Sequence, residues 1–154
     1  MSKFAKDTNV SVEKSRGEIE KNLQRYGATA FSYMVRNSPT DAKAMVQFES
    51  GEKVVQFVLP LPDFADFAET ETGRERSSDV QLKHWEQACR QRWRALNLCI
   101  KAKLEAVDCG ITTFEQEFLA HIIVPGTNKT IGSEIIPKIA RAYEENTVPL
   151  LTFG

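Results

Sequence analysis

The feature that most constrains the fold is a long run of helical periodicity between Asp79 and Gly110. Apolar residues recur in it at steps of three and four, the spacing of one face of an α-helix. They are Leu82, Trp85, Cys89, Trp93, Leu96, Ile100, Leu104 and Val107. Ser78 or Asp79 can cap the start, and Gly110 stands where a left-handed residue commonly ends a helix. At about 1.5 Å per residue the helix is roughly 45 Å long, enough to cross a small domain.

The same helix carries a strip of cations beside its apolar face. At about 100° per residue, four of them fall within roughly 40° of one another. They are Lys83, Arg90, Arg94 and Lys101. Arg92 projects from the other border, and Glu86 is the only acid between Val80 and Leu104, although the chain has a formal net charge of -1. Such a strip can contact phosphates or simply face solvent, and both interpretations stay open. Trp85 and Trp93 lie on the apolar face, so we expect both to be mostly in the core.

The overall composition predicts one globular domain. The chain has 154 residues, with 42% hydrophobic and 27% charged residues, which is ordinary for a single domain. No apolar run approaches the roughly 20 residues that span a bilayer, and the N-terminus lacks the apolar core of a signal peptide, so we expect a cytoplasmic protein. Cys89, Cys99 and Cys109 are spaced ten apart without a CxxC pair. We interpret them as reduced thiols, with Cys89 in the core.

The first half of the chain predicts a helix followed by an antiparallel meander. Residues 1–9 are polar and expected to be flexible, and a helix is expected from Val10 to Tyr26. Three strands follow, at Thr29–Arg36, Lys43–Glu49 and Lys53–Leu59. The third, VVQFVL, is apolar on both sides, which predicts a central strand or one covered twice. The expected fold is therefore α+β: a three-stranded antiparallel sheet packed on one long helix, with smaller helices at both ends.

Two further segments flank the long helix. Residues 69–78 are polar and aperiodic, which predicts an exposed mobile loop that carries Arg74 and Arg76. After Gly110, Thr112 or Thr113 can form a capping box at the start of a short helix.

The rest of the chain ends in another helix and an apolar tail. An extended segment is expected at Ile122–Val124, and Ser133 is expected to open a last helix. The tail, NTVPLLTFG, is apolar enough to dock on the body or to touch a neighbouring subunit.

No motif for catalysis stands out. Phosphate-cradling glycine loops and a nucleophile elbow are absent from the sequence. Glu117 and His121 are four residues apart on one helical face, where they can share a metal or form an ordinary helix-end hydrogen bond. The helix–meander–helix order also resembles the core of restriction-like nucleases. That resemblance implies a magnesium site at Asp41, Glu49 and Lys53, although the ExK pattern of the third strand is missing.

Two other resemblances bear on function. Over roughly residues 29–108 the element order resembles that of phage single-strand annealing proteins, in which oligomers hold a nucleic-acid strand in a basic groove. WEQACRQRWRAL, IKAKLEAV and GITTFEQEFLAHI are similar to small uncharacterised proteins of tailed bacteriophages and prophages. These resemblances imply a role in phage DNA metabolism or recombination within a bacterial host cell.

The leading hypothesis is a non-enzymatic nucleic-acid-binding protein, for single-strand binding or annealing, that needs no metal or cofactor and acts as an oligomer. Its expected contacts are Lys83, Arg90, Arg94, Lys101, Arg92, Arg74 and Arg76. The first alternative is an interaction module that inhibits or adapts a host protein. The second is the magnesium nuclease.

Overall fold

The computed structural model describes residues 5–36, 38 and 41–153, and it has the predicted α+β architecture. Residues 1–4 of the predicted flexible N-terminus lie outside the described residues. In chain order the elements are α1 (Val12–Arg25), β1 (Ala28–Arg36), β2 (Lys43–Ser50), β3 (Lys53–Pro60), the 3-10 helix η1 (Phe64–Phe67), α2 (Ser78–Asp108), α3 (Phe114–Phe118), the 3-10 helix η2 (Leu119–His121) and α4 (Ile131–Glu145).

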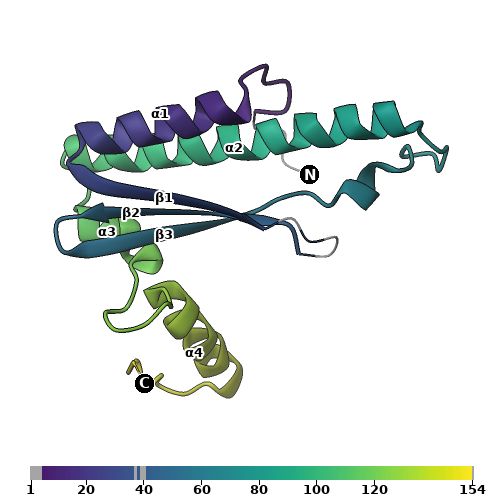
Figure 1. The fold of residues 1–154 in the computed structure, drawn as a ribbon. Helices are drawn as coiled ribbons and strands as arrows, with labels where there is room; N and C mark the ends of the chain where they lie inside the picture. Colours follow the sequence, from purple (N-terminus) through teal and green to yellow (C-terminus); the bar gives the residue numbers. More distant parts are fainter. Residues whose placement is uncertain (1–4, 37, 39–40, 154) are drawn as a thin grey trace.

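The fold has two main layers. β1, β2 and β3 form an antiparallel sheet in that order, and α1 and α2 lie side by side across one of its faces (Figure 1). Alternate strand residues point to this face, because successive side chains of a strand alternate between the two faces of the sheet. The buried core contains Ile19, Leu23, Val46, Phe48, Val55, Phe57, Trp93, Ile100 and Leu104. The long helix is therefore the main cover of the meander, as its periodicity predicts.

The position of the third strand was predicted wrongly. β2 is the central strand, and β3 is an edge strand whose Val58 is 50% exposed. Two consecutive hairpins place the middle strand of a meander in the centre, whatever the hydrophobicity of the others. The outer edge of β3 is partly covered by the chain after η2, where the Ile123 N–H donates to the Val54 carbonyl (2.8 Å).

The long helix begins and ends close to its predicted bounds. Ser77, rather than Ser78 or Asp79, is the N-cap, and its side chain accepts from the Val80 N–H. Gly110 follows the helix with φ +73°, the left-handed conformation expected there. Trp93 is buried, as predicted.

The N-terminal part of the long helix reaches beyond the sheet (Figure 1). Trp85 is therefore only half-buried, and its Nε1 donates to the Pro62 carbonyl (2.9 Å). Cys89 is also only half-buried, which corrects its predicted core position.

The segment 69–78 is exposed, but it forms a hydrogen-bonded turn. The Thr70 N–H donates to the Arg74 carbonyl (2.8 Å), and the Arg74 N–H donates back to the Thr70 hydroxyl (3.1 Å). The Arg76 N–H donates to the Ala68 carbonyl (2.8 Å).

The C-terminal part of the chain, which includes α4, lies on the β3 side of the sheet (Figure 1). Thr113 and Gln116 form the predicted capping box at the start of α3. Thr130, not Ser133, caps α4, which contacts the body mainly through η2. Among the described residues, no helix is both long and apolar enough to cross a membrane.

Candidate nucleic-acid interface

α1 lies against the basic strip of α2. Two of the four cations of this strip, Arg90 and Arg94, already form hydrogen bonds within the protein. The Nη1 of Arg94 donates to the Oε2 of Glu18 on α1 at 2.5 Å. Arg90 donates from Nε and Nη2 to the Oε1 of Gln87 on its own helix (3.1 and 2.6 Å). Both arginine side chains are partly buried. Arg94 therefore links α2 to α1, whereas the hydrogen bonds of Arg90 stay within α2.

A buried amide completes this contact between the helices. Asn97 is 2% exposed, and its Nδ2 donates to the same Glu18 oxygen at 2.7 Å. Its Oδ1 accepts from the Nδ2 of Asn22 at 3.5 Å. A buried polar side chain is stable only when it is hydrogen-bonded, so Asn97 depends on α1 being in place.

The other predicted cations are distributed over several surfaces. Lys83 and Lys101 are exposed on the α1 side of α2, whereas Arg92 is exposed about half a turn away from them. Arg74 is exposed at the turn before α2. Arg76 is tied down, because its Nη1 donates to the carbonyls of Phe67 (3.1 Å) and Glu69 (2.9 Å). The structure thus does not bring the seven predicted residues together on one surface.

α1 supplies cations that the sequence reasoning missed. Lys14, Lys21 and Arg25 are all exposed, and at about 100° per residue they fall within roughly 40° of one another. They lie next to Glu18, on the α2-facing and outward side of α1. Their spacing of seven and four residues was a detectable signal. Acidic residues between these cations in the sequence made the helix look mixed in charge, so the shared face of the cations was not recognised.

The outer face of the two-helix layer therefore collects exposed cations from both helices. We call this set the outer basic face, and it comprises Lys14, Lys21, Arg25, Lys83 and Lys101. Among the described residues, none of the five has an ion-pair partner. At about 100° per residue Glu13 and Glu20 lie about 100–120° from Lys14 on α1, and Glu18 is already paired with Arg94. The exposed Glu105 and Asp108 fall within about 40° of Lys101 on α2, so this face also carries acids at the C-terminal end of α2.

The two tryptophans near this face are not free to stack on bases. Trp93 is buried, with the guanidinium of Arg16 5.4 Å from its ring centroid. Trp85 is held by its hydrogen bond and by an edge-to-face contact with Phe64 at 5.9 Å. The outer basic face thus presents ammonium and guanidinium groups, without a free tryptophan ring beside them.

The proposed metal ligands lie apart. Asp41 and Glu49 stand near opposite ends of β2, about 25 Å apart along a strand, and Lys53 pairs with Glu115 (3.0 Å). Glu117 pairs with Lys103 (3.1 Å). Within the described ranges, no group of three or more histidine, cysteine or acidic residues is arranged to hold a metal.

His121 has a structural environment. Its ring stacks on Phe57 with 4.1 Å between centroids. Burial lowers its pKa, and the charge of Lys103 lowers it further. The histidine is thus kept neutral within the packing between η2 and β3.

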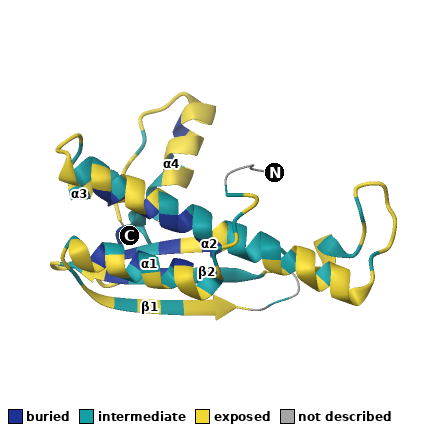
Figure 2. Cartoon of the chain, turned by 90° about the horizontal axis from the view of Figure 1, so that it is seen from above, coloured by how far each residue is buried: buried dark blue, intermediate teal, exposed yellow. Residues whose placement is uncertain are grey.

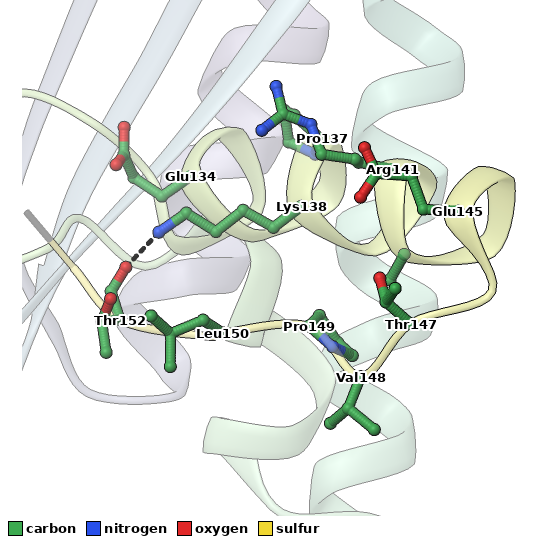
Figure 3. A pocket seen from close by; sticks show the side chains of 11 residues that line it. Glu134, Pro137, Lys138, Arg141, Glu145, Thr147, Val148, Pro149, Leu150 and Thr152 are labelled. Atoms are coloured by element: carbon green, nitrogen blue, oxygen red, sulfur yellow. Dashed lines mark hydrogen bonds between the residues drawn. The ribbon is translucent and has the colours of Figure 1, made fainter.

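The tail folds back along α4, and the two line a cleft between them (Figure 3). Lys138 donates to the Thr152 carbonyl, and the cleft measures about 480 Å³. Lys138 and Arg141 line it together with Glu134 and Glu145. These charges balance, so the cleft shows no preference for an anion or a cation.

Comparisons of the chain with known protein families, with curated proteins and with solved structures find no match.

Proposed function

We propose that this chain is a non-enzymatic nucleic-acid-binding protein whose outer basic face contacts the phosphate backbone. The observation that carries the proposal is the gathering of five exposed, unpaired cations from two helices on one face of the layer. Phosphate contacts by lysine and arginine release condensed counterions and supply most of the affinity that does not depend on sequence. The whole chain has a net charge of -1, so any affinity for phosphates must come from the local charge of the outer basic face.

The dimensions of the outer basic face suit a nucleic-acid backbone. Lys83 and Lys101 are separated by eighteen residues of α2, which is about 27 Å along the helix axis. Successive phosphates of one strand of B-form DNA advance by about 3.4 Å, so the face can follow roughly eight of them. We extend the proposal to a role in phage DNA metabolism or recombination in the bacterial cytoplasm, which is what the resemblance of the sequence to phage proteins implies.

Charge reversal at two sets of exposed positions, one on the outer basic face and one away from it, tests the proposal. Fluorescence anisotropy with labelled single- and double-stranded oligonucleotides would compare the double variant Lys21→Glu, Lys101→Glu with the matched variant Arg74→Glu, Arg92→Glu. Both variants change the net charge equally at exposed positions. We expect the first to lose at least tenfold in affinity and the second to lose much less. Equal losses would refute the assignment to the outer basic face.

α4 favours a second candidate function, binding of a host protein. Ile136 is 61% and Tyr143 85% exposed, and Ile139 lies with them on one face of the helix. An exposed apolar stripe of this kind often marks a protein interface. The test is affinity capture from nuclease-treated bacterial lysate. This candidate requires a protein retained by the wild type and lost by Ile136→Asp.

A further inference from the structure

β1 is the open edge of the sheet. The outer edge of β3 is partly closed by the hydrogen bond from Ile123 to Val54. In contrast, β1 runs along the margin of the molecule with no element beyond it when the chain is seen from above (Figure 2). Among the described residues, β1 is therefore the edge strand with no hydrogen-bonded neighbour on its outer side.

The register identifies which backbone groups of β1 are free. In an antiparallel sheet each residue directs its N–H and C=O to the same side, and successive residues alternate. The carbonyl of Val54 points away from β2, and following the register through β2 places the outward groups of β1 on Phe31, Tyr33 and Val35. Outside the helices and strands, no backbone hydrogen bond among the described residues involves these three.

This edge has little protection against pairing. Proteins usually block an exposed edge with charged side chains, proline or a bulge. From Phe31 to Val35 there is no charge and no proline, and the register irregularity lies earlier, between Ala28 and Ala30. Val35 is 44% exposed and Phe31 and Tyr33 are half-buried, so α1 covers the apolar side of this strand incompletely.

We propose that a second copy of this chain covers the edge by antiparallel β1–β1 pairing across a two-fold axis at Tyr33. In this register Phe31 faces Val35 of the other copy, an aromatic and β-branched pair that stabilises sheets. The free backbone groups of Phe31, Tyr33 and Val35 then all find partners. Arg36, the only charge on β1, faces Ala30 of the other copy, so no like charges oppose each other. This self-complementarity favours a second copy over an unrelated peptide.

The association stops at two copies, because a third copy would need the outer edge of β3. That edge is already paired with Ile122 and Ile123. A two-fold axis perpendicular to the sheet keeps both helix layers on the same side. Two outer basic faces then lie on one surface. This last consequence rests on the proposed function, whereas the dimer itself does not.

Light scattering after size exclusion, without nucleic acid, tests the dimer with the full chain at micromolar concentration. We expect the wild type to have twice the mass of one chain. Val35→Pro removes an outward N–H and no hydrogen bond to β2, so it should give a folded monomer with an unchanged circular dichroism spectrum. The control Val35→Thr keeps the N–H and should stay dimeric. A monomeric wild type, or a dimer that persists in folded Val35→Pro, overturns the proposal.

A cross-link tests the register even if Val35→Pro fails to fold. Ser32 and Met34 bond to β2, so across the proposed axis they form a closely spaced pair, about 4.5 Å between Cα atoms, within disulfide range. With the exposed Cys99 and Cys109 replaced by serine, a mixture of Ser32→Cys and Met34→Cys chains should oxidise to linked dimers. Neither chain alone should do so. No cross-link in the mixture, or equal cross-linking of each chain alone, contradicts this register.

Discussion

Asn97 shows why a buried polar residue lies at the border of the apolar face of α2, where that face meets α1. Its amide donates to Glu18, which also accepts from Arg94, so one carboxylate joins two groups of the long helix to α1. A partly buried ion pair of this kind stabilises mainly when its oxygens are fully hydrogen-bonded. The network therefore specifies how the two helices align more than it adds to stability.

Replacing Asn97 with alanine should lower the free energy of unfolding by about 1–3 kcal/mol, because Glu18 loses a buried donor. Urea denaturation followed by circular dichroism measures this change. The exposed Lys101, on the same helix, provides the control: Lys101→Ala should stay within about 0.5 kcal/mol of the wild type. Equal stability of all three proteins would mean that the amide network contributes nothing.

The thiol of Cys89 should react slowly with alkylating reagents. Burial raises its pKa to about 11, and Glu86 adds to this effect, so little thiolate exists at pH 8. Cys99 and Cys109 are exposed and should be modified first. Mass spectrometry of the folded protein after brief iodoacetamide treatment shows the order. Preferential modification of Cys89 would contradict its placement.

His121 should make the stability depend on pH. Because its pKa is lowered in the folded state, the unfolded chain binds a proton more readily. The stabilisation is complete above the unfolded pKa of about 6.5 and is lost as the pH falls below it. The urea midpoint should therefore drop between pH 7.5 and 5.5.

Two histidine variants identify the source of that drop. His121→Phe keeps a ring against Phe57 and should flatten the dependence, whereas the exposed His84→Gln should leave it as in the wild type. An unchanged slope in His121→Phe would assign the effect to other groups.

At the scale of elements, α4 contacts the body mainly through η2. Gly132 is buried there, and a Cβ at this position would approach the Ala120 carbonyl oxygen to 2.7 Å. Only glycine allows the first turn of α4 to come so close to η2. The rest of the helix projects away from the sheet (Figure 1), and its exposed apolar side chains are Ile136, Ile139 and Tyr143.

Two glycine-to-alanine changes should have opposite signs. Gly132→Ala should destabilise by about 1–3 kcal/mol, because backbone must move to make room. Gly17→Ala meets no atom within 4 Å and should stabilise α1 by about 0.5–1 kcal/mol. Thermal unfolding of both variants checks the signs. A neutral Gly132→Ala would show that α4 docks elsewhere or not at all.

At the scale of the whole molecule, periodicity predicted which segments become helices and strands. The long helix and the meander follow from spacings of three to four and of two residues, which report burial within one element. The same spacing cannot tell which other element lies against a charged strip. Arg94 was therefore predicted as a free cation although it pairs with Glu18, and Lys14 and Lys21 were absent from the predicted contacts. The packing of α1 against α2, which are distant in sequence, determines which of these cations are paired and which are exposed.

The most direct test of the central claim is the salt dependence of oligonucleotide binding by the wild type and by Lys21→Glu, Lys101→Glu. For a single strand, each phosphate contact contributes about -0.7 to the slope of log affinity against log salt concentration. We predict a steep negative slope for the wild type, and a slope shallower by about 1.4 in the variant. Binding that does not depend on salt, or an equal slope in both proteins, would contradict the outer basic face as a phosphate-binding surface.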